Sequence, residues 1–502
     1  MISTDHSGAL VPDLLGGALP RFPDKIAVDA AEGRLTFAEV SDRAARLAGL
    51  LAQRGVGPGR RVALLAMNDL EYLEIRVGVQ RAGAILVPLN YRLSQGELEA
   101  ILADADVDLL IVGRGLEALA APWVLHLGDG GYAAAIADAV AQPVPVGFDP
   151  EAIGQIAYTS GTTARPKGVM LSNRSVHAGT VAMGHELGST SDAIFLVCAP
   201  LFHVGSEVPF SCTMLGATLV QVPKFDVEAV LAALDRTRAT HCQMVPTMIR
   251  MVLDAWGDRG VSSLRRILYG AAPMPPALLR RAIAVLGCEF VNGYGSTEAM
   301  GISFLTPAEH DPDRAPGRLA SVGRSSMLSR AIVADEDGAE VAPGEVGEVL
   351  ACGPALMSGY WRNPEATAEA LRGGWMHTGD MAYRDADGYL YLVDRRNDKI
   401  VTGGENVFPS EVEHVLTQHP DVAEAAVVGV AHPLWGEAVA AVVVAREGSA
   451  PDPDALLAHC RASLAGYKVP KLLRVEAEPL PRTATGKLLR RELRRAWAEA
   501  AG

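Results

Sequence analysis

The chain has 502 residues, which exceeds the size at which single hydrophobic cores stop growing, so we expect two or more domains. Its 49% hydrophobic and 21% charged residues are typical of an ordinary soluble globular protein. The formal net charge of −14 argues against a nucleic-acid-binding protein, because such proteins need a basic face.

The cysteines and the terminal segments indicate the compartment. The six cysteines are scattered, without a C-x-x-C pair or a His/Cys cluster at zinc spacing, and we interpret them as buried or free thiols in a reducing compartment. No segment approaches the roughly 18 to 20 consecutive apolar residues of a membrane span, and the N-terminus lacks a signal-peptide pattern. We therefore expect a cytoplasmic enzyme.

Predicted helices and strands alternate in the first third of the chain. Thr36 and Glu39 form a capping-box signature at the start of a helix, and Ser94 and Glu97 form a second one. Strands that alternate with helices predict βαβ units and an α/β fold. The elements expected here are helices over 34–54 and 70–81, a helix after Ser94, and strands over 61–66, 84–88, 107–112 and 153–158.

Residues 158–168 (Tyr-Thr-Ser-Gly-Thr-Thr-Ala-Arg-Pro-Lys-Gly) form a loop after the strand at 153–158. Its glycines let the backbone wrap closely around a ligand, and successive N–H groups can bind an anion. The serine and threonine hydroxyls add donors, and Lys167 adds a compact positive charge. This composition predicts a polyphosphate-binding loop that differs from the Walker-type pattern, with a Ser/Thr-rich surface turn as the alternative.

The alternation continues to about residue 300, where two predicted strands end in glycine-bearing turns at 270–272 and 293–298. Because ligands bind outside the carboxyl ends of strands in open α/β sheets, we expect these turns and the loop at 158–168 to line one crevice. His203 follows another strand and is a further candidate, with a structural histidine as the alternative. The expected elements are helices over 172–183, 227–236, 247–256 and 276–286, and strands over 194–200, 218–222, 243–246, 264–269 and 288–292.

Beyond residue 320 the pattern changes to strands and turns, which predicts a small β-region. The polar run at 394–399 is the best candidate for a linker, and the tail behind it is long enough for its own small core. The tail ends in a basic helix whose arginines we interpret as a solvated face. Contact of this helix with a membrane surface is the alternative.

Taken together, these stretches resemble the adenylate-forming superfamily, which includes acyl-CoA synthetases, peptide-synthetase adenylation domains and beetle luciferases. The resemblance covers nearly the whole chain and rests on six motifs in the family's order: 158–168, 292–298, 375–380, 389–399, 403–413 and 481–487. It implies a large N-terminal domain of α/β sheets with a small β-region over 1–393, a hinge at 394–399, and a smaller, mobile α+β domain over 400–502.

By this resemblance the protein is an AMP-forming acid–thiol ligase that uses ATP, Mg²⁺ and coenzyme A. A carboxylate attacks the α-phosphorus of ATP, so positioned cations and donors supply most of the catalysis. The resemblance assigns the pyrophosphate grip to Thr159, Ser160, Gly161, Thr162, Thr163 and Lys167, and the ribose contacts to Asp380 and Arg395. It places the remaining nucleotide-binding positions at Gly270, Ala271, Ala272, Asn292, Gly293, Tyr294, Gly295 and Thr297.

The resemblance also implies the catalytic groups. Lys487 matches the lysine that bridges the carboxylate and the α-phosphate, and Thr297, Glu298 and His203 complete the catalytic set. Glu298 is expected to hold Mg²⁺, which prefers oxygen ligands, with a helix N-terminal carboxylate as the alternative. Two residues depart from the family pattern: Ala164, where a glycine is usual, and Asn397, where Asp or Lys is usual.

In the second half-reaction a thiol attacks the acyl-adenylate. The resemblance implies that the C-terminal domain rotates and that Gly403 and Gly404 then line the pantetheine tunnel, where glycines leave room for a narrow chain. Free coenzyme A is the expected acceptor, because the chain lacks the large insertion of fatty acyl-AMP ligases. A carrier-protein thiol is the alternative.

The acid itself is the open question. The positions that resemble the acyl pocket are small or apolar, without an arginine or lysine for a dicarboxylate or an acidic residue for an amino group: His203, Val204, Gly205, Ser206, Val245, Ala271, Gly293, Met300 and Gly301. This favours a medium- or long-chain fatty acid, with an aryl or cinnamate-type acid as the alternative. A non-catalytic binding protein on the same fold is a third hypothesis.

Overall fold

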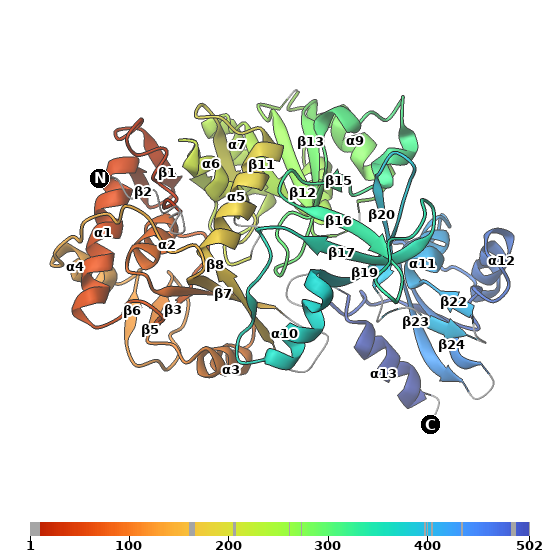
Figure 1. The fold of residues 1–502 in the computed structure, drawn as a ribbon. Helices are drawn as coiled ribbons and strands as arrows, with labels where there is room; N and C mark the ends of the chain where they lie inside the picture. Colours follow the sequence, from red (N-terminus) through yellow and green to blue (C-terminus); the bar gives the residue numbers. More distant parts are fainter. Residues whose placement is uncertain are drawn as a thin grey trace. The chain divides into compact units, whose positions relative to one another are not determined.

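The computed structural model describes residues 11–159, 166–203, 207–260, 262–272, 274–395, 398, 400–402, 405–432, 435–482 and 488–500 (Figure 1). The chain divides into two compact units, one with residues 1–331 and 350–377 and the other with residues 332–349 and 378–502. This boundary lies before the predicted hinge at 394–399, and the hinge itself stays a prediction. None of the helices in the described ranges is long and apolar enough to cross a membrane.

One sheet of the first unit has seven strands. They lie in the order β18 (Gly359–Tyr360), β8 (Lys167–Ser172), β7 (Ile153–Thr159), β4 (Ile85–Leu89), β3 (Arg61–Leu65), β5 (Leu109–Val112) and β6 (Val124–His126). The strands from β7 to β6 are parallel, whereas β8 and β18 are antiparallel to their neighbours. The central parallel strands β3, β4 and β5 are wholly buried, as expected for apolar strands covered on both faces.

The second sheet of this unit has nine strands. They lie in the order β15 (Arg324–Ser325), β14 (Ser303–Leu305), β13 (Glu289–Tyr294), β12 (Arg266–Gly270), β11 (His241–Met244), β9 (Ile194–Val197), β10 (Thr218–Gln221), β1 (Ile26–Ala30) and β2 (Gly33–Thr36). The six strands from β13 to β1 are parallel, and antiparallel strands complete both edges.

Helices connect these strands (Figure 1). They are α1 (Phe37–Gln53), α2 (Tyr72–Arg81), α3 (Gln95–Ala105), α4 (Gly131–Ala137), α5 (Asn173–Leu187), α6 (Glu207–Met214), α7 (Val227–Thr237), α8 (Pro246–Asp254), α9 (Pro276–Leu286) and α10 (Pro364–Ala370), with 3₁₀ turns η3 (Pro307–Glu309), η4 (Pro316–Ala320) and η5 (Arg372–Gly374). Both predicted capping boxes are confirmed, at Thr36 with Glu39 and at Ser94 with Glu97. The alternation of strands and helices is confirmed as well.

The second unit holds most of a four-stranded sheet and a five-stranded sheet. The first has the order β16 (Arg330–Ala334), β17 (Val346–Cys352), β19 (Met376–Arg384), β20 (Leu390–Arg395). The second has the order β22 (Glu405–Val407), β21 (Ile400–Thr402), β24 (Gly436–Ala445), β23 (Val422–His432), and β25 (Leu472–Glu476) also pairs with β24. The helices of this unit are α11 (Pro409–Thr417), α12 (Pro453–Ser463) and α13 (Arg490–Ala500).

The expected loop at 158–168 is shorter in the structure. Thr159 ends β7, and Lys167 begins β8, a strand that the sequence did not predict. The two strands form an antiparallel pair in which Thr159 lies opposite Lys167. Because β8 has only six residues and leads directly into α5, its sequence pattern does not stand out from that of the loop before it and the helix after it.

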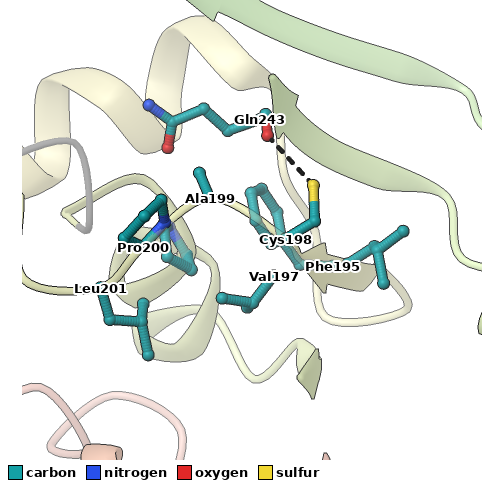
Figure 2. A pocket seen from close by; sticks show the side chains of 9 residues that line it. Phe195, Val197, Cys198, Ala199, Pro200, Leu201 and Gln243 are labelled. Carbon is teal, nitrogen blue, oxygen red and sulfur yellow. Dashed lines mark hydrogen bonds between the residues drawn. The ribbon is translucent and has the colours of Figure 1, made fainter. Parts of the chain in front are cut away.

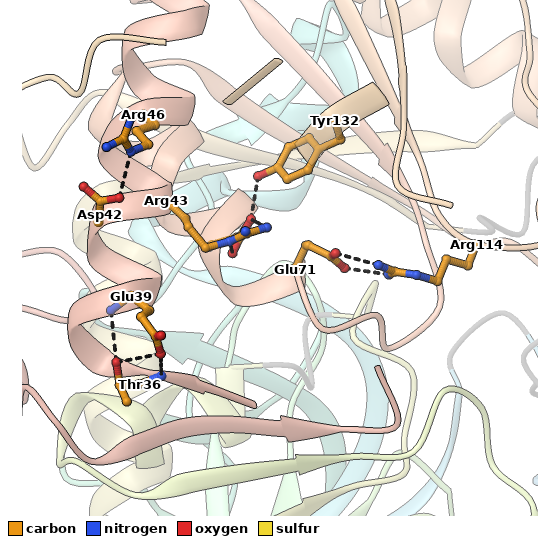
Figure 3. Close-up of polar contacts among 9 residues, drawn as sticks. Thr36, Glu39, Asp42, Arg43, Arg46, Glu71, Arg114 and Tyr132 are labelled. Atoms are coloured by element: carbon orange, nitrogen blue, oxygen red, sulfur yellow. Dashed lines mark hydrogen bonds and ion pairs between the residues drawn. The ribbon is translucent and has the colours of Figure 1, made fainter. Parts of the chain in front are cut away.

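A buried carboxylate holds α1 and α2 together. Glu74 is fully buried, and its carboxylate accepts hydrogen bonds from Arg43 Nη2 at 2.9 Å and from Tyr132 Oη at 2.9 Å. Burial raises the pKa of Glu74 to about 7, against the opposing effect of Arg43. Figure 3 shows Arg43 and Tyr132 pointing toward each other, while Arg46 on the same helix pairs with Asp42.

We expect Arg43→Met to lower the free energy of unfolding by about 2 kcal/mol, because Glu74 would stay buried without its cationic partner. Arg46→Met is the matched control on α1: its ion pair with Asp42 is largely exposed and contributes about 0.5 kcal/mol. Urea unfolding of the two variants and the wild type measures both values. Equal losses in the two variants would contradict this role of Glu74.

Candidate functional site

Neighbouring strands of the nine-stranded sheet bring predicted site residues to one edge. β9, β11, β12 and β13 are parallel, and Gly270 lies opposite Gly293 in the register. Their carboxyl ends therefore lie together, which is where ligands bind in open α/β sheets. Residues 270–272 span the end of β12 and the start of the turn after it, and residues 293–298 span the end of β13 and the turn after it. The structure therefore confirms that these two predicted turns are neighbours.

The turn after β12 combines a close backbone approach with local strain. A Cβ atom on Gly270 would lie 2.2 Å from the carbonyl oxygen of Gly293, so no side chain fits there. The next residue, Ala271, has φ 63°, a left-handed conformation that costs a non-glycine residue about 1 to 3 kcal/mol. Ala272 follows it and is exposed. Strained backbone of this kind concentrates at ligand-binding sites.

Hydrogen bonds fix the tyrosine that lies beside Asn292. His310 Nδ1 lies 2.8 Å from the Thr306 carbonyl oxygen, which can only accept, so Nδ1 carries the proton. Nε2 therefore accepts from Tyr269 Oη at 2.9 Å. Burial lowers the pKa of His310, which favours this neutral tautomer. Tyr269 lies directly opposite Asn292 in the register of β12 and β13, so the carboxyl end of β13 has a fixed neighbour on this side.

Tyr360 joins Glu298 to the end of the glycine-rich loop. β18 pairs with β8 so that Tyr360 lies opposite Val169, two residues after Lys167. Tyr360 Oη donates to Glu298 Oε1 at 3.0 Å, and Lys167 Nζ lies 5.0 Å from the centre of the Tyr360 ring. Burial and the nearby Glu298 charge raise the pKa of Tyr360, so its hydroxyl stays a donor. The sequence did not predict a role for Tyr360, because an aromatic residue after a glycine, here Gly359, is not a specific motif.

Glu298 suits Mg²⁺ by its chemistry. Mg²⁺ is usually held by one or two carboxylates together with substrate phosphates and waters. Within the described ranges, no group of three or more His, Cys, Asp or Glu side chains could hold a metal ion by itself. A single carboxylate such as that of Glu298 is the kind of protein ligand that Mg²⁺ uses together with nucleotide phosphates.

The other residues of the turn at 293–298 form a compact bend. Tyr294 is buried, and its carbonyl oxygen accepts from the N–H of Ile302 at 2.8 Å. A Cβ atom on Gly295 would lie 2.8 Å from the Gly301 nitrogen, so the bend needs glycine at 295. Thr297 is half-buried beside Glu298. The bend therefore presents Thr297 and Glu298 from a closely packed backbone.

Two predicted ribose residues belong to the second unit. Asp380 in β19 lies directly opposite Arg395 in β20. The N–H of Asp380 donates to Thr378 Oγ1 at 3.1 Å, and the N–H of Gly379 donates to Glu348 Oε1 at 2.9 Å. These bonds fix the backbone of β19 next to Asp380. Seven predicted site residues lie outside the described residues: Ser160, Gly161, Thr162, Thr163, Gly403, Gly404 and Lys487.

The predicted acyl-pocket residues come from several elements. His203 is exposed, and its ring packs on Phe202 with the two ring centres 4.3 Å apart. Met300 packs against α5, where a Cβ atom on Gly179 would lie 2.9 Å from Met300 Cε. Val245 immediately precedes α8. The remaining positions of the segment after His203, residues 204–206, lie outside the described residues.

Figure 2 shows a small cavity at the carboxyl end of β9. The thiol of Cys198, which lines this cavity, donates to the backbone carbonyl oxygen of Gln243 at 3.5 Å. Burial raises the pKa of Cys198 to about 12, so the thiol stays protonated and is no nucleophile. The cavity is part of the apolar packing beneath the segment that leads to His203. Its lining residues are Phe195, Leu196, Val197, Cys198, Ala199, Pro200, Leu201, Pro209 and Gln243.

Comparisons with known proteins bear on this site. Residues 18–361 match the family described as AMP-binding enzyme, and residues 411–487 match its C-terminal domain. A feruloyl-CoA synthase of Amycolatopsis sp is 42% identical over 481 residues, 94% of this chain and 96% of the relative. The fatty acid–[acyl-carrier-protein] ligase ScoC of Streptomyces coeruleorubidus is 38% identical over 490 residues, 94% of this chain and 93% of the relative.

A solved structure shares the fold over nearly the whole length. The crystal structure of ATP-bound MatB from Rhodopseudomonas palustris superposes with a TM-score of 0.87 at 30% sequence identity. The match covers 97% of this chain and 98% of MatB. This chain therefore shares its α/β architecture, with a large N-terminal part and a smaller C-terminal part, with a protein whose structure was solved with ATP bound.

We expect Gly270→Ala to weaken ATP binding by about tenfold, because the added methyl group would push β12 and β13 apart where both turns begin. Gly96→Ala is the control: it lies in α3 with open space around its Cβ position, and alanine favours the helix. Calorimetric titration with ATP and Mg²⁺ gives the dissociation constants. A Gly270→Ala protein that folds and binds ATP as tightly as Gly96→Ala would contradict the assignment of this turn.

Proposed function

Because the chain belongs to the AMP-binding enzyme family, and is thereby an AMP-forming acid–thiol ligase, we propose that it activates an apolar carboxylic acid with ATP and transfers the acyl group to coenzyme A. The observation that carries this proposal is the neighbouring pair of turns at 270–272 and 293–298, joined through Tyr360 to Lys167. In this proposal the two turns bind the adenosine and the α-phosphate, and the glycine-rich loop at 158–168 binds the outer phosphates.

The residues have separate roles in adenylation. Asn292 accepts from the adenine amine, and Thr297 donates to the α-phosphate, where negative charge accumulates during attack. Lys167 offsets the charge of the outer phosphates, and Tyr360 holds the Glu298 carboxylate in place by its hydrogen bond. Glu298 would hold Mg²⁺, which when bound neutralises phosphate charge. Lys487 contributes a second cation between the carboxylate and the α-phosphate.

We propose an aryl acid of the cinnamate type as the first candidate substrate. The amino-acid sequence alone favoured a fatty acid, because the predicted pocket positions are small and apolar. A relative named feruloyl-CoA synthase, however, is 42% identical to this chain, whereas a fatty acid–[acyl-carrier-protein] ligase is 38% identical. A medium- or long-chain fatty acid is the second candidate, and a carrier-protein thiol is the second candidate acceptor.

An acid panel tests the substrate class. We expect ferulate and related cinnamates to give AMP in a reaction that requires ATP, Mg²⁺ and coenzyme A, at a higher kcat/KM than acids from octanoate to palmitate. Each acid is assayed with free coenzyme A beside a holo carrier protein, and AMP and the thioester are measured together. A preference for the fatty acids would reverse our order of candidates, and no AMP with any acid would refute the proposed function.

We expect Lys487→Ala to lower the adenylation rate by about 100-fold or more, because one positioned cation at the developing charge would be lost. ATP binding should change little, since Lys167 and the two turns remain. Pyrophosphate exchange measures adenylation, and calorimetry measures ATP binding. Lys471→Ala is the control, because Lys471 is an exposed lysine of the same unit that packs on the Trp435 ring. Unchanged exchange in Lys487→Ala would refute the role of this lysine.

A further inference from the structure

The segment that contains His203 is held at both ends by residues from one region of the chain. It lies between β9 and α6, and its described residues are 199–203 and Glu207, among them His203, a predicted residue of the acid pocket. The residues that hold it are Asn68, Tyr72 and Arg76, which follow one another at intervals of four. Tyr72 and Arg76 lie on one face of α2, and Asn68 lies in the turn before this helix.

Both polar atoms of the Asn68 side-chain amide form hydrogen bonds with backbone atoms. Its Oδ1 accepts from the N–H of Leu201 at 3.0 Å, and its Nδ2 donates to the carbonyl oxygens of Ala199 at 3.1 Å and Val222 at 2.9 Å. The side chain is 1% exposed. Because every polar atom of the amide has a partner among main-chain groups, Asn68 fixes the path of the chain just after β9 without depending on any neighbouring side chain.

Tyr72 adds a bond to the same residue of the segment. Its Oη donates to the Leu201 carbonyl oxygen at 3.0 Å, and the ring is fully packed, stacked near Phe210 of α6. Leu201 therefore has its N–H bound by Asn68 and its carbonyl oxygen bound by Tyr72. The two bonds hold the peptide groups on both sides of Leu201, two residues before His203.

Arg76 holds the other end of the segment through a buried ion pair. It contacts Glu207, the first residue of α6, which is 0% exposed, while its Nη1 donates to Gln155 in β7 at 2.9 Å. The second carboxylate oxygen of Glu207 accepts from Thr180 Oγ1 at 2.8 Å. A buried ion pair persists when hydrogen bonds satisfy its remaining atoms, as they do here. Glu207 is thereby fixed relative to both α2 and α5.

We propose that Asn68, Tyr72 and Arg76, here called the α2 anchor, are positioning residues that set the place of His203. Resting on the proposed function, this inference assigns the α2 anchor to acid recognition and not to ATP binding. Among the described residues of the segment, the anchor bonds to Ala199, Leu201 and Glu207. These bonds lie on both sides of His203 in the chain, so the anchor determines where His203 lies.

Two tyrosine-to-phenylalanine substitutions, each of which removes one buried hydroxyl group, test the proposal. Tyr72→Phe removes only the hydroxyl that binds Leu201, and we expect KM for ferulate to rise about fivefold while KM for ATP changes less than twofold. Tyr132→Phe is the matched control, because Tyr132 is equally buried and its hydroxyl binds Glu74, also on α2 but away from the segment. We expect its KM for ferulate to match that of the wild type.

Several outcomes would overturn the proposal. If Tyr72→Phe and Tyr132→Phe shift the two KM values alike, the hydroxyl of Tyr72 is merely structural. If Tyr72→Phe does not fold, Glu207→Ala and Glu207→Gln replace it: we expect the alanine variant to raise KM for the acid and the isosteric glutamine variant to restore most of the loss. Equal values for these two variants would overturn the proposal.

Hydrogen exchange separates this inference from the proposed function. The backbone amides of Ala199 and of residues 201–203 should exchange about fivefold faster in Tyr72→Phe than in Tyr132→Phe, whichever acid the enzyme uses. If the wild type turns over no acid, the proposed function fails, and faster exchange in Tyr72→Phe would still support the anchoring of this segment. Identical exchange in the two variants would overturn the anchoring as well.

Discussion

The parallel alignment of β9, β11, β12 and β13 is the constraint on which the candidate site depends. Because these strands run in one direction, their carboxyl ends and the turns that follow meet at one edge of the sheet. The approach of Gly270 to the carbonyl of Gly293 leaves no room for a side chain between the turns. Backbone contact, and not a pair of side chains, therefore sets the spacing of the predicted adenosine-binding turns.

Long-range contacts add the remaining parts of the site to this edge. The two-residue strand β18 pairs with β8 and places Tyr360 between Lys167 and Glu298, which are 131 residues apart in the chain. His310 likewise holds Tyr269, which lies opposite Asn292 in the register of β12 and β13. In both cases a residue outside the predicted motifs fixes a neighbour of a motif residue.

Helix α2 shows how buried charged side chains can position neighbouring elements of the fold. Nine of its ten residues are buried, including Glu74, Arg76 and Arg81, each of which has a partner of opposite charge. Buried ion pairs stabilise little compared with apolar packing, but they are costly to break on one side. They therefore hold α1 and α6 in defined places, while hydrogen bonds of Asn68 and Tyr72 hold the segment after β9.

The sequence by itself determined the alternation of strands and helices, the two capping boxes and the glycine-bearing turns, because these depend on periodicity and on neighbours within a few residues. It left out the hairpin of β1 and β2 and several short elements. It also pointed to Glu298, Asn292 and Lys167 through motifs of fixed spacing. Only the tertiary structure decided that β8 follows the loop, that Tyr360 joins Lys167 to Glu298, and that Asn68, Tyr72 and Arg76 hold the segment of His203. Such contacts join residues far apart in the chain, and a charged residue on a helix has the same local pattern whether it faces water or a buried partner.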